Sequence, residues 1–583
     1  MKKCNFSLGQ CVNRFGKLLN SRFFFYFLLV IAVYLSLSQM YHCIHIWYDR
    51  EWIIHLRRLP DAMLLALPVL FWKKRAIIFS WLILVDLYML SIVWYFQTYG
   101  TIMPLSSYLM INNLNGLFPC IWHAVQAEDF LIVFPSIIYA IIYTCLYKKI
   151  RKNTRLKLCV CIVILLIGMV AASYYPNKRW LSPLYLYSVV QVKTFKEFGL
   201  INFWIYQIHF HRGVSVEEKE YAKDFVESLP ENIYATKRDS VNKDRNLILI
   251  LVESMQSWPI GLTINGVEVT PEINALLRQL NTVYFPKEIP QVKDGRSSDA
   301  QLIINTGLLP LYQGAASGIC THNTFPSLAE ALNKNGYTTA SFICDGKDFW
   351  NQEVMSANYQ FKYLFDGMQK NAGIDKADEM LFKSTLPLLK ELQQPFYAQI
   401  VTLSSHSPYL RPLFKSALEN DSFPNEEVKY YLIAMQYVDY CIGRFIRKLK
   451  SDGLYENSVV VITGDHEEMT FNHYEGRKEL KAEDCFVPFI VLNSPLLSDH
   501  ENKVIGQIDL YPSLLDLMGC HDYYFRGLGE SVFNDKVSNY AMYRSGIAAA
   551  GGEIPDSIKA YRKECWKVSD ILLRMNYFGN LDK

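Results

Sequence analysis

The chain has 583 residues, of which 51% are hydrophobic and 20% charged, and its formal net charge is only +3. This length allows two domains, and the composition combines membrane-embedded and soluble parts. Within the N-terminal part, lysine and arginine fall in the loops beside the apolar runs, and no basic stripe in the rest of the chain supports nucleic acid as a partner, so we exclude it.

Five apolar runs lie in the first part of the chain: 22–43, 60–72, 76–97, 129–147 and 158–174. All but 60–72 approach the roughly 20 residues that span a hydrocarbon core. Basic loops near membrane ends stay on the cytoplasmic side, and the alternation of such loops works only if 60–72 also crosses. We therefore predict a multi-pass protein of the cell membrane with five helices, its N-terminus inside and everything after about Tyr174 outside. No small-residue cleavage signal follows the first run, which predicts an uncleaved anchor.

After residue 244 the apolar residues fall in short runs typical of buried strands: 246–254, 338–344, 395–403, 458–465 and 486–493. Helical stretches such as 325–336 separate these runs. Alternating strands and helices predict an α/β domain with a largely parallel central sheet that helices cover on both faces.

Six of the thirteen cysteines fall in this outer part of the chain: Cys320, Cys344, Cys441, Cys485, Cys520 and Cys565. An oxidising compartment permits disulfides among them, but the sequence does not give their connectivity.

Polar residues follow the predicted strands, at the place where α/β sheets bind ligands. Glu253 ends the first strand, and Asp465 and His466 end a later one. Ser297 and Ser298 lie in a polar, glycine-containing loop between them. Two carboxylates and an imidazole suit a divalent ion such as Mn, Mg or Zn, and a hydroxyl held against that ion loses its proton more easily. Each residue alone is a weak signal, but their joint occurrence predicts a metal-activated serine nucleophile.

Six motifs then occur in a characteristic order: VESMQSW (252–258), DGRSSD (294–299), FWN (349–351), SSHSPY (404–409), ITGDHEE (462–468) and QIDLYPSLLDLMG (507–519). With these motifs the chain resembles the lipoteichoic acid synthase type of the alkaline phosphatase and sulfatase superfamily. The resemblance covers nearly the whole chain. It implies five membrane helices, an extracytoplasmic catalytic domain, and one divalent ion, with manganese expected first and magnesium or zinc as alternatives.

Carried over residue by residue, the resemblance implies that Glu253, Asp465 and His466 hold the ion together with the nucleophile. The family's nucleophile, usually a threonine, falls on Ser297. Ser298 is a rival for this role. A substitution of Ser297 is therefore the natural test of the nucleophile.

The resemblance also implies a substrate pocket. His406 matches a residue that contacts the substrate phosphate or the leaving oxygen, and Trp350 matches an aromatic residue that lines the headgroup pocket. Gln352 stands where the family has arginine, which removes a bidentate phosphate clamp. We therefore expect either a different substrate or a differently placed cation, such as Arg296 or Lys347.

Two further positions depart from the family, of which Ile343 also bears on the headgroup. Ile343 replaces an expected histidine, and Glu467 replaces the more usual glycine after the histidine of the GDH motif. The departures at the pocket leave the donor headgroup open.

The domain plan follows from the hydropathy and the motifs together. We predict a five-helix transmembrane domain at 1–174, juxtamembrane helices and a linker at 175–243, and a sulfatase-like catalytic domain at 244–535. The C-terminal extension, 536–583, is predicted to form a strand and a helix packed on the catalytic domain.

The resemblance implies a metal-dependent transferase of the cell envelope. It would move a phosphoglycerol-type headgroup from a phospholipid to an envelope glycan or lipid acceptor through a phosphoserine. Phosphoethanolamine transfer is the nearest alternative. A sulfatase-like phosphodiester or sulfate ester hydrolase is another, although the loop 297–301 lacks the proline and arginine of the C/S-x-P-x-R signature. The last alternative is a non-catalytic membrane receptor or scaffold.

Overall fold

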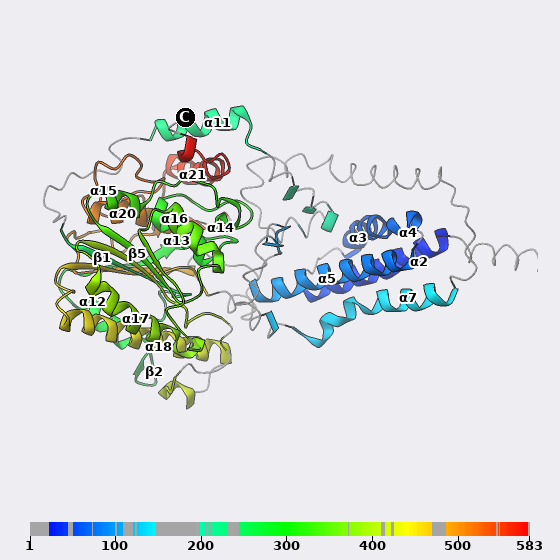
Figure 1. Cartoon of the computed structure of the whole chain (residues 1–583), viewed down its shortest axis with the longest axis horizontal. Coiled ribbons are helices and arrows are strands. Elements are labelled where there is room, and N and C mark those ends of the chain that lie inside the picture. The colour runs from blue at the N-terminus through cyan, green and yellow to red at the C-terminus, as the bar shows by residue number, and fades with distance from the viewer. Residues whose placement is uncertain are drawn as a thin grey trace, which may run out of the picture. The chain divides into compact units, whose positions relative to one another are not determined.

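The computed structural model describes these residues: 22–44, 51–72, 74–99, 125–146, 213–229, 244–370, 372–407, 409, 414–420, 425–468, 485–543, 546 and 548–580, with shorter pieces of 102–122 and 195–208. The chain divides into two compact units (Figure 1). The first comprises Met1–Met103 and Pro119–His211, and the second comprises Pro104–Phe118 and Arg212–Lys583. The four predicted domain limits stay a prediction.

The first unit is helical. Its elements are α2 (Arg22–Cys43), α3 (Glu51–Ala66), α4 (Pro68–Phe71), α5 (Arg75–Tyr99), the 3-10 helix η2 (Ala127–Ile132) and α7 (Phe134–Leu146). Three stretches in the described residues are long and apolar enough to cross a membrane: Phe24–Cys43, Arg75–Thr98 and Ala127–Leu146. They coincide with three of the predicted runs. The short run 60–72 falls in α3 and α4, outside those stretches, and the run 158–174 lies outside the described residues, so the count of five stays a prediction.

The second unit is built on an eight-stranded sheet. Its strands are β1 (Asn246–Val252), β4 (Val283–Ile289), β5 (Thr338–Ile343), β6 (Tyr363–Phe365), β7 (Phe396–Val401), β8 (Ser458–Gly464), β9 (Val487–Leu492) and β10 (Ile505–Gly506). They are ordered β10-β4-β9-β8-β1-β7-β5-β6. Only β9 runs antiparallel to its neighbours, and every other pair is parallel. The largely parallel sheet and all five predicted strands are confirmed.

Helices cover both faces of this sheet, as predicted (Figure 1). One face carries α12 (Pro271–Leu277), α17 (Ala377–Glu391) and α18 (Glu426–Ser451), and the other carries α13 (Ser297–Thr306), α15 (Leu328–Lys334), α16 (Gln352–Asn358) and α20 (Leu510–Leu517). The strands β1 and β8 are buried along their whole length, because both faces of the parallel sheet are covered. Smaller elements are α11 (Val216–Glu227), α14 (Ala316–Ile319) and the hairpin of β2 (Thr263–Ile264) and β3 (Val267–Glu268).

The C-terminal segment forms β11 (Tyr540–Met542), β12 (Ala548–Ala550) and α21 (Asp556–Arg574). Arg562 of α21 reaches back to the domain, with Nη1 2.7 Å from Asp509 Oδ1 and Nη2 2.8 Å from Glu530 Oε1. These groups are largely buried, so the segment is held to the sheet domain by an internal ion-pair cluster.

The six outer cysteines form no disulfides in the structure. All six are free thiols with buried side chains. Pairing among them, which an oxidising compartment would permit, is therefore not part of this fold.

Candidate active site

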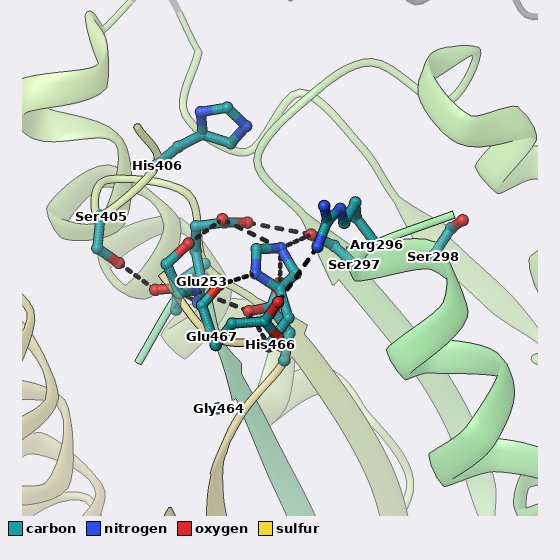
Figure 2. A network of polar contacts seen from close by, with 12 residues as sticks. Glu253, Arg296, Ser297, Ser298, Ser405, His406, Gly464, His466 and Glu467 are labelled. Atoms are coloured by element: carbon teal, nitrogen blue, oxygen red, sulfur yellow. Dashed lines mark hydrogen bonds and ion pairs between the residues drawn. The ribbon is translucent and has the colours of Figure 1, made fainter. Parts of the chain in front are cut away.

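Three potential metal ligands converge at the carboxyl ends of two neighbouring strands. Glu253 follows β1, and Asp465 and His466 follow β8, which pairs with β1 in parallel (Figure 2). One ligand atom from each residue lies within 4.8 Å of the others. His466 Nε2 is 3.6 Å from Glu253 Oε1 and 3.5 Å from Asp465 Oδ2. The parallel register thus brings together residues that are more than two hundred positions apart in the chain.

Ser297 joins this cluster from the other side. Its Oγ donates to Glu253 Oε2 at 3.1 Å and lies 3.4 Å from His466 Nε2. Ser297 is the first residue of α13, so the positive end of the helix dipole lies at the hydroxyl. The structure therefore places all four predicted ligand residues at one point.

The loop before Ser297 is fixed by its own side chains. Asp299 Oδ2 accepts from the backbone amides of Lys293 and Gly295, both at 2.9 Å. A Cβ at position 295 would lie 2.2 Å from Asp299 Oδ1, so only glycine fits there. This packing fixes the start of α13 and with it the direction of Ser297.

Ser298 points elsewhere. Its buried Oγ donates to Gly295 O at 2.7 Å and lies 3.0 Å from Ser317 Oγ. Figure 2 draws this hydroxyl turned away from His466. The geometry therefore favours Ser297 over its rival.

Strained backbone holds Glu253 and Asp465 together. Ser254 adopts a left-handed φ of 51°, donates through Oγ to Glu253 Oε1 at 2.8 Å, and donates its amide to Asp465 Oδ1 at 2.7 Å. A Cβ at Gly464 would lie 2.1 Å from Met255 O, so the turns after β1 and β8 can approach only because this residue is glycine. Non-glycine residues at positive φ cluster at functional sites.

The electrostatics of the cluster suit a divalent cation. Burial, and then the charge of Asp465, raises the pKa of Glu253 to about 8. Asp465 Oδ2 is buried and accepts no hydrogen bond from the described residues. His466 Nδ1 lies 2.9 Å from Glu467 O, so this nitrogen carries the proton and Nε2 presents its lone pair to the carboxylates. An unsatisfied oxygen, two crowded carboxylates and an oriented imidazole fit a bound Mn, Mg or Zn ion.

His406 stands beside the cluster and is not part of it. Figure 2 draws its ring apart from Glu253 and His466. Its Nδ1 lies 2.5 Å from Ser407 O, which leaves Nε2 as the proton acceptor of the neutral ring. Asp378 holds the loop by accepting the amides of Leu403 and Ser404, at 2.8 and 3.0 Å.

The predicted headgroup residues lie on a neighbouring loop. Trp350, with a φ of 51°, belongs to the 3-10 helix η5 (Phe349–Asn351), and Gln352 follows it as a buried residue at the start of α16. Asn351 Nδ2 donates to Ser317 O at 2.8 Å, and Ser317 contacts Ser298. The loop of Trp350 is thus tied to the loop of the nucleophile through α14.

Of the two candidate replacement cations, only Arg296 lies at the cluster. Its Nη1 is 3.4 Å from Glu467 Oε1, next to His466. Lys347 instead pairs with Glu353 at 2.6 Å, and both side chains are about half exposed, 47% and 59%. A surface pair of this kind leaves Lys347 without a role at Ser297.

Several residues of the site were not singled out from the sequence. Ser405 Oγ donates to Glu253 O at 2.5 Å, and Gln507 Nε2 donates to Asp465 O at 2.8 Å. Both lie in motifs that were recognised, SSHSPY and QIDLYPSLLDLMG, so the signal was present without a role attached. Tyr543, whose hydroxyl donates to Glu467 Oε1 at 2.6 Å, lies outside every motif.

The chain is similar in sequence to several known proteins. The Sulfatase family matches residues 245–520. The chain is 29% identical over 336 residues to lipoteichoic acid synthase 2 of Bacillus subtilis (strain 168), covering 54% of this chain and 51% of that protein. It is 29% identical over 323 residues to the lipoteichoic acid synthase of Staphylococcus aureus (strain bovine RF122 / ET3-1), covering 52% and 50%. The alignments thus span about half the length of these curated relatives.

One solved structure resembles the chain over most of its length. It is the integral membrane protein lipooligosaccharide phosphoethanolamine transferase A from Neisseria meningitidis. The match covers 84% of this chain and 95% of that chain, with a TM-score of 0.52 and 14% identity. At this identity the likeness concerns the fold.

Proposed function

Because residues 245–520 form a sulfatase-family domain, we propose that this chain is a membrane-anchored, metal-dependent phosphotransferase. It moves a phosphoglycerol-type headgroup from a phospholipid to an envelope glycan or lipid acceptor. The observation that supports this most is the position of Ser297 Oγ, 3.1 Å from Glu253 and 3.4 Å from His466. A serine hydroxyl that lies against a buried cluster of potential metal ligands is in the position that a nucleophile would occupy.

The reaction proceeds in two displacements. Ser297 Oγ attacks phosphorus, its proton passes to solvent, and the bond from phosphorus to the diacylglycerol oxygen breaks as that oxygen takes up a proton. An acceptor hydroxyl then attacks the phosphoserine, loses its proton, and releases Ser297. Covalent catalysis of this kind divides one difficult displacement into two easier ones.

A divalent ion held by Glu253, Asp465 and His466 would supply charge neutralisation at the phosphoryl oxygens and lower the pKa of the serine hydroxyl. The protein itself orients the groups. The hydrogen bond from His466 Nδ1 to Glu467 O holds the imidazole plane, and Ser254 holds the Glu253 carboxylate. Ser405 supports the same turn through the hydrogen bond that its Oγ donates to Glu253 O.

His406 serves the leaving and entering oxygens. With Nδ1 bound to Ser407 O at 2.5 Å, Nε2 accepts a proton from the incoming hydroxyl, and in the first step a protonated ring delivers one to diacylglycerol. Trp350 lines the headgroup pocket. Arg296 takes over the phosphate-binding role of the family's arginine, whose position Gln352 occupies in this chain. Each of these roles rests on the loop positions described above.

The membrane unit supports a lipid donor. We propose five spans with the N-terminus inside and the catalytic domain on the extracytoplasmic side, which anchors Ser297 in the compartment of the envelope acceptor. Tethering an enzyme near headgroups raises their effective concentration at its site.

The nucleophile is tested in the full chain, reconstituted with manganese and labelled phosphatidylglycerol. Ser297→Ala should abolish diacylglycerol release and the labelled phosphoserine, a loss of at least about 10³-fold. Ser298→Ala is the matched control, because its hydroxyl hydrogen-bonds within the loop, and it should keep both. Labelling that survives Ser297→Ala would exclude the assignment.

The headgroup is tested by giving the enzyme labelled phosphatidylglycerol and phosphatidylethanolamine side by side. The phosphoglycerol proposal requires diacylglycerol from the first lipid. Release from the second alone would instead establish phosphoethanolamine transfer. Mass analysis of the Ser297 peptide, taken from protein purified from its own membrane, would identify the adduct directly.

A further inference from the structure

Two adjacent residues of the nucleophile loop meet two adjacent residues after β8. Ser297 Oγ lies 3.4 Å from His466 Nε2, and Arg296 Nη1 lies 3.4 Å from Glu467 Oε1. Both members of the ion pair are enclosed, with side-chain exposures of 9% for Arg296 and 2% for Glu467. The guanidinium is therefore held against Glu467, the residue that follows His466, and Figure 2 draws it close to Ser297.

Glu467 is itself held by the C-terminal segment. The hydroxyl of Tyr543, a buried residue directly after β11, donates to Glu467 Oε1 at 2.6 Å. The end of β11 is fixed to the sheet domain, because Gln291 Nε2 donates to Met542 O at 3.0 Å. A chain of contacts thus runs from the C-terminal segment through Glu467 to Arg296.

The conformation of Arg296 makes such support necessary. Its backbone has φ 46° and ψ −120°, outside the regions that non-glycine residues favour. An arginine side chain also has several rotatable bonds, and fixing it costs conformational entropy. Glu467 and Tyr543 therefore determine where the guanidinium points.

We propose that Glu467 and Tyr543 are positioning residues that hold the Arg296 guanidinium beside Ser297 as a clamp for the non-reacting phosphoryl oxygens. The inference rests on the proposed function and assigns a role in it to the C-terminal segment. Arginine presents parallel N–H donors to phosphate, so its orientation decides how well it binds. Neither positioning residue needs to touch the substrate.

The test uses the manganese-loaded full chain with two readouts, turnover of labelled phosphatidylglycerol and binding of inorganic phosphate by calorimetry. Tyr543→Phe removes only the hydroxyl, and Glu467→Gln removes only the charge. Each should raise KM and the phosphate Kd by roughly tenfold, with kcat within about threefold, because a loosened clamp weakens binding of ground state and transition state alike.

A matched control comes from the same segment. Tyr561 OH donates to Leu528 O at 3.1 Å, so Tyr561→Phe also removes a hydrogen-bonded tyrosine hydroxyl, but one that is not bonded to Glu467. It should leave KM and the phosphate Kd unchanged. An equal effect of Tyr561→Phe would reduce the result to general destabilisation and overturn the inference.

A double-mutant cycle separates positioning from a structural role. In an Arg296→Ala background, Tyr543→Phe and Glu467→Gln should have no further effect, because the residue through which they act is gone. Effects that add in full would overturn the inference, as would unchanged KM and Kd in the single variants. Failure of the unmodified protein to release diacylglycerol from either lipid would overturn the proposed function alone, since phosphate binding still tests the clamp.

Discussion

Two buried carboxylate clusters in the described part of the second unit are neutralised in different ways. At the C-terminal segment, Asp509 and Glu530 surround Arg562, which supplies an internal cation at 2.7 and 2.8 Å. At the strand ends, His466 is the ion-pair partner that the described residues give to Glu253 and Asp465. The first cluster is electrostatically complete within the chain, whereas the second becomes so only with an added cation.

The pKa values follow this difference. Burial raises the pKa of Asp509, but the charge of Arg562 opposes that rise, and the pKa of Arg562 is itself raised by Asp509 and Glu530. At the strand ends burial and Asp465 act in the same direction on Glu253, raising its pKa to about 8. We therefore expect the completed cluster to serve stability, and we propose that the incomplete one serves binding and chemistry.

The largest difference between the two clusters should appear when the divalent ion or one of its ligands is removed. Chelation, or Asp465→Asn, should lower turnover by on the order of 10³-fold, because charge neutralisation at the phosphoryl oxygens is lost. Diacylglycerol release from labelled phosphatidylglycerol measures this. Manganese added back should restore the chelated protein and fail to restore the variant. Full activity without a divalent ion would show that the cluster of Glu253 and Asp465 needs no added cation, like the cluster around Arg562.

Removing the internal cation should instead act on stability. Arg562→Ala leaves Asp509 and Glu530 buried without their partner, which should lower the free energy of unfolding by about 3–5 kcal/mol. Urea titration of the full chain in detergent measures this, with the buried Trp566 on α21 as one of the fluorescent reporters.

The control for that prediction is an exposed pair on the same helix. Lys559 Nζ lies 3.2 Å from Asp556 Oδ1, and the aspartate side chain is 99% exposed. Lys559→Ala should leave the unfolding midpoint unchanged, because solvent screens such pairs. A similar shift in both variants would mean that α21 as a whole, and not its buried charge, sets the stability.

The metal-free cluster should also make stability depend on pH. A carboxyl whose pKa is higher in the folded state than in the unfolded chain stabilises the fold at low pH, and this contribution is lost as the pH rises. For Glu253 the window runs from its ordinary value of 4.5 to about 8. With chelator present, the melting temperature should therefore fall across this window, and Glu253→Gln or bound manganese should remove most of the fall. A slope that persists in Glu253→Gln would assign it to other groups.

The smallest effect concerns the cation that the structure leaves at the surface. Lys347→Ala should change KM for labelled phosphatidylglycerol by less than about twofold, because its exposed pair with Glu353 contributes little. Arg296→Ala is the companion variant and should raise KM strongly. Equal increases of KM in Lys347→Ala and Arg296→Ala would contradict the assignment of different roles to the two cations.

The sequence could predict the strands that are continuous apolar runs, such as β1 and β8. It missed β4, VYFPKEI, because proline, lysine and glutamate interrupt its pattern. Without β4 the reversed direction of β9, which lies between β4 and β8, could not be derived. The direction of a strand depends on its partners, and no local signal in the chain records it.

At the site, Glu253, Asp465 and His466 could be singled out because they follow the buried strands β1 and β8. The surroundings were not, since they depend on contacts distant in sequence. The hydrogen bond from Tyr543 to Glu467 spans 76 residues and begins outside every recognised motif. The unusual glutamate after His466 was visible in the sequence, but only the fold supplies Arg296 as its partner.

The buried thiols of the second unit have a consequence for its redox chemistry. Burial raises the pKa of Cys320 and Cys565 to about 12, and that of Cys344 well above its ordinary range. Only the ionised sulfur attacks a disulfide, so these cysteines hold almost no reactive form at neutral pH. In the folded unit these three thiols are therefore poor partners for thiol–disulfide exchange.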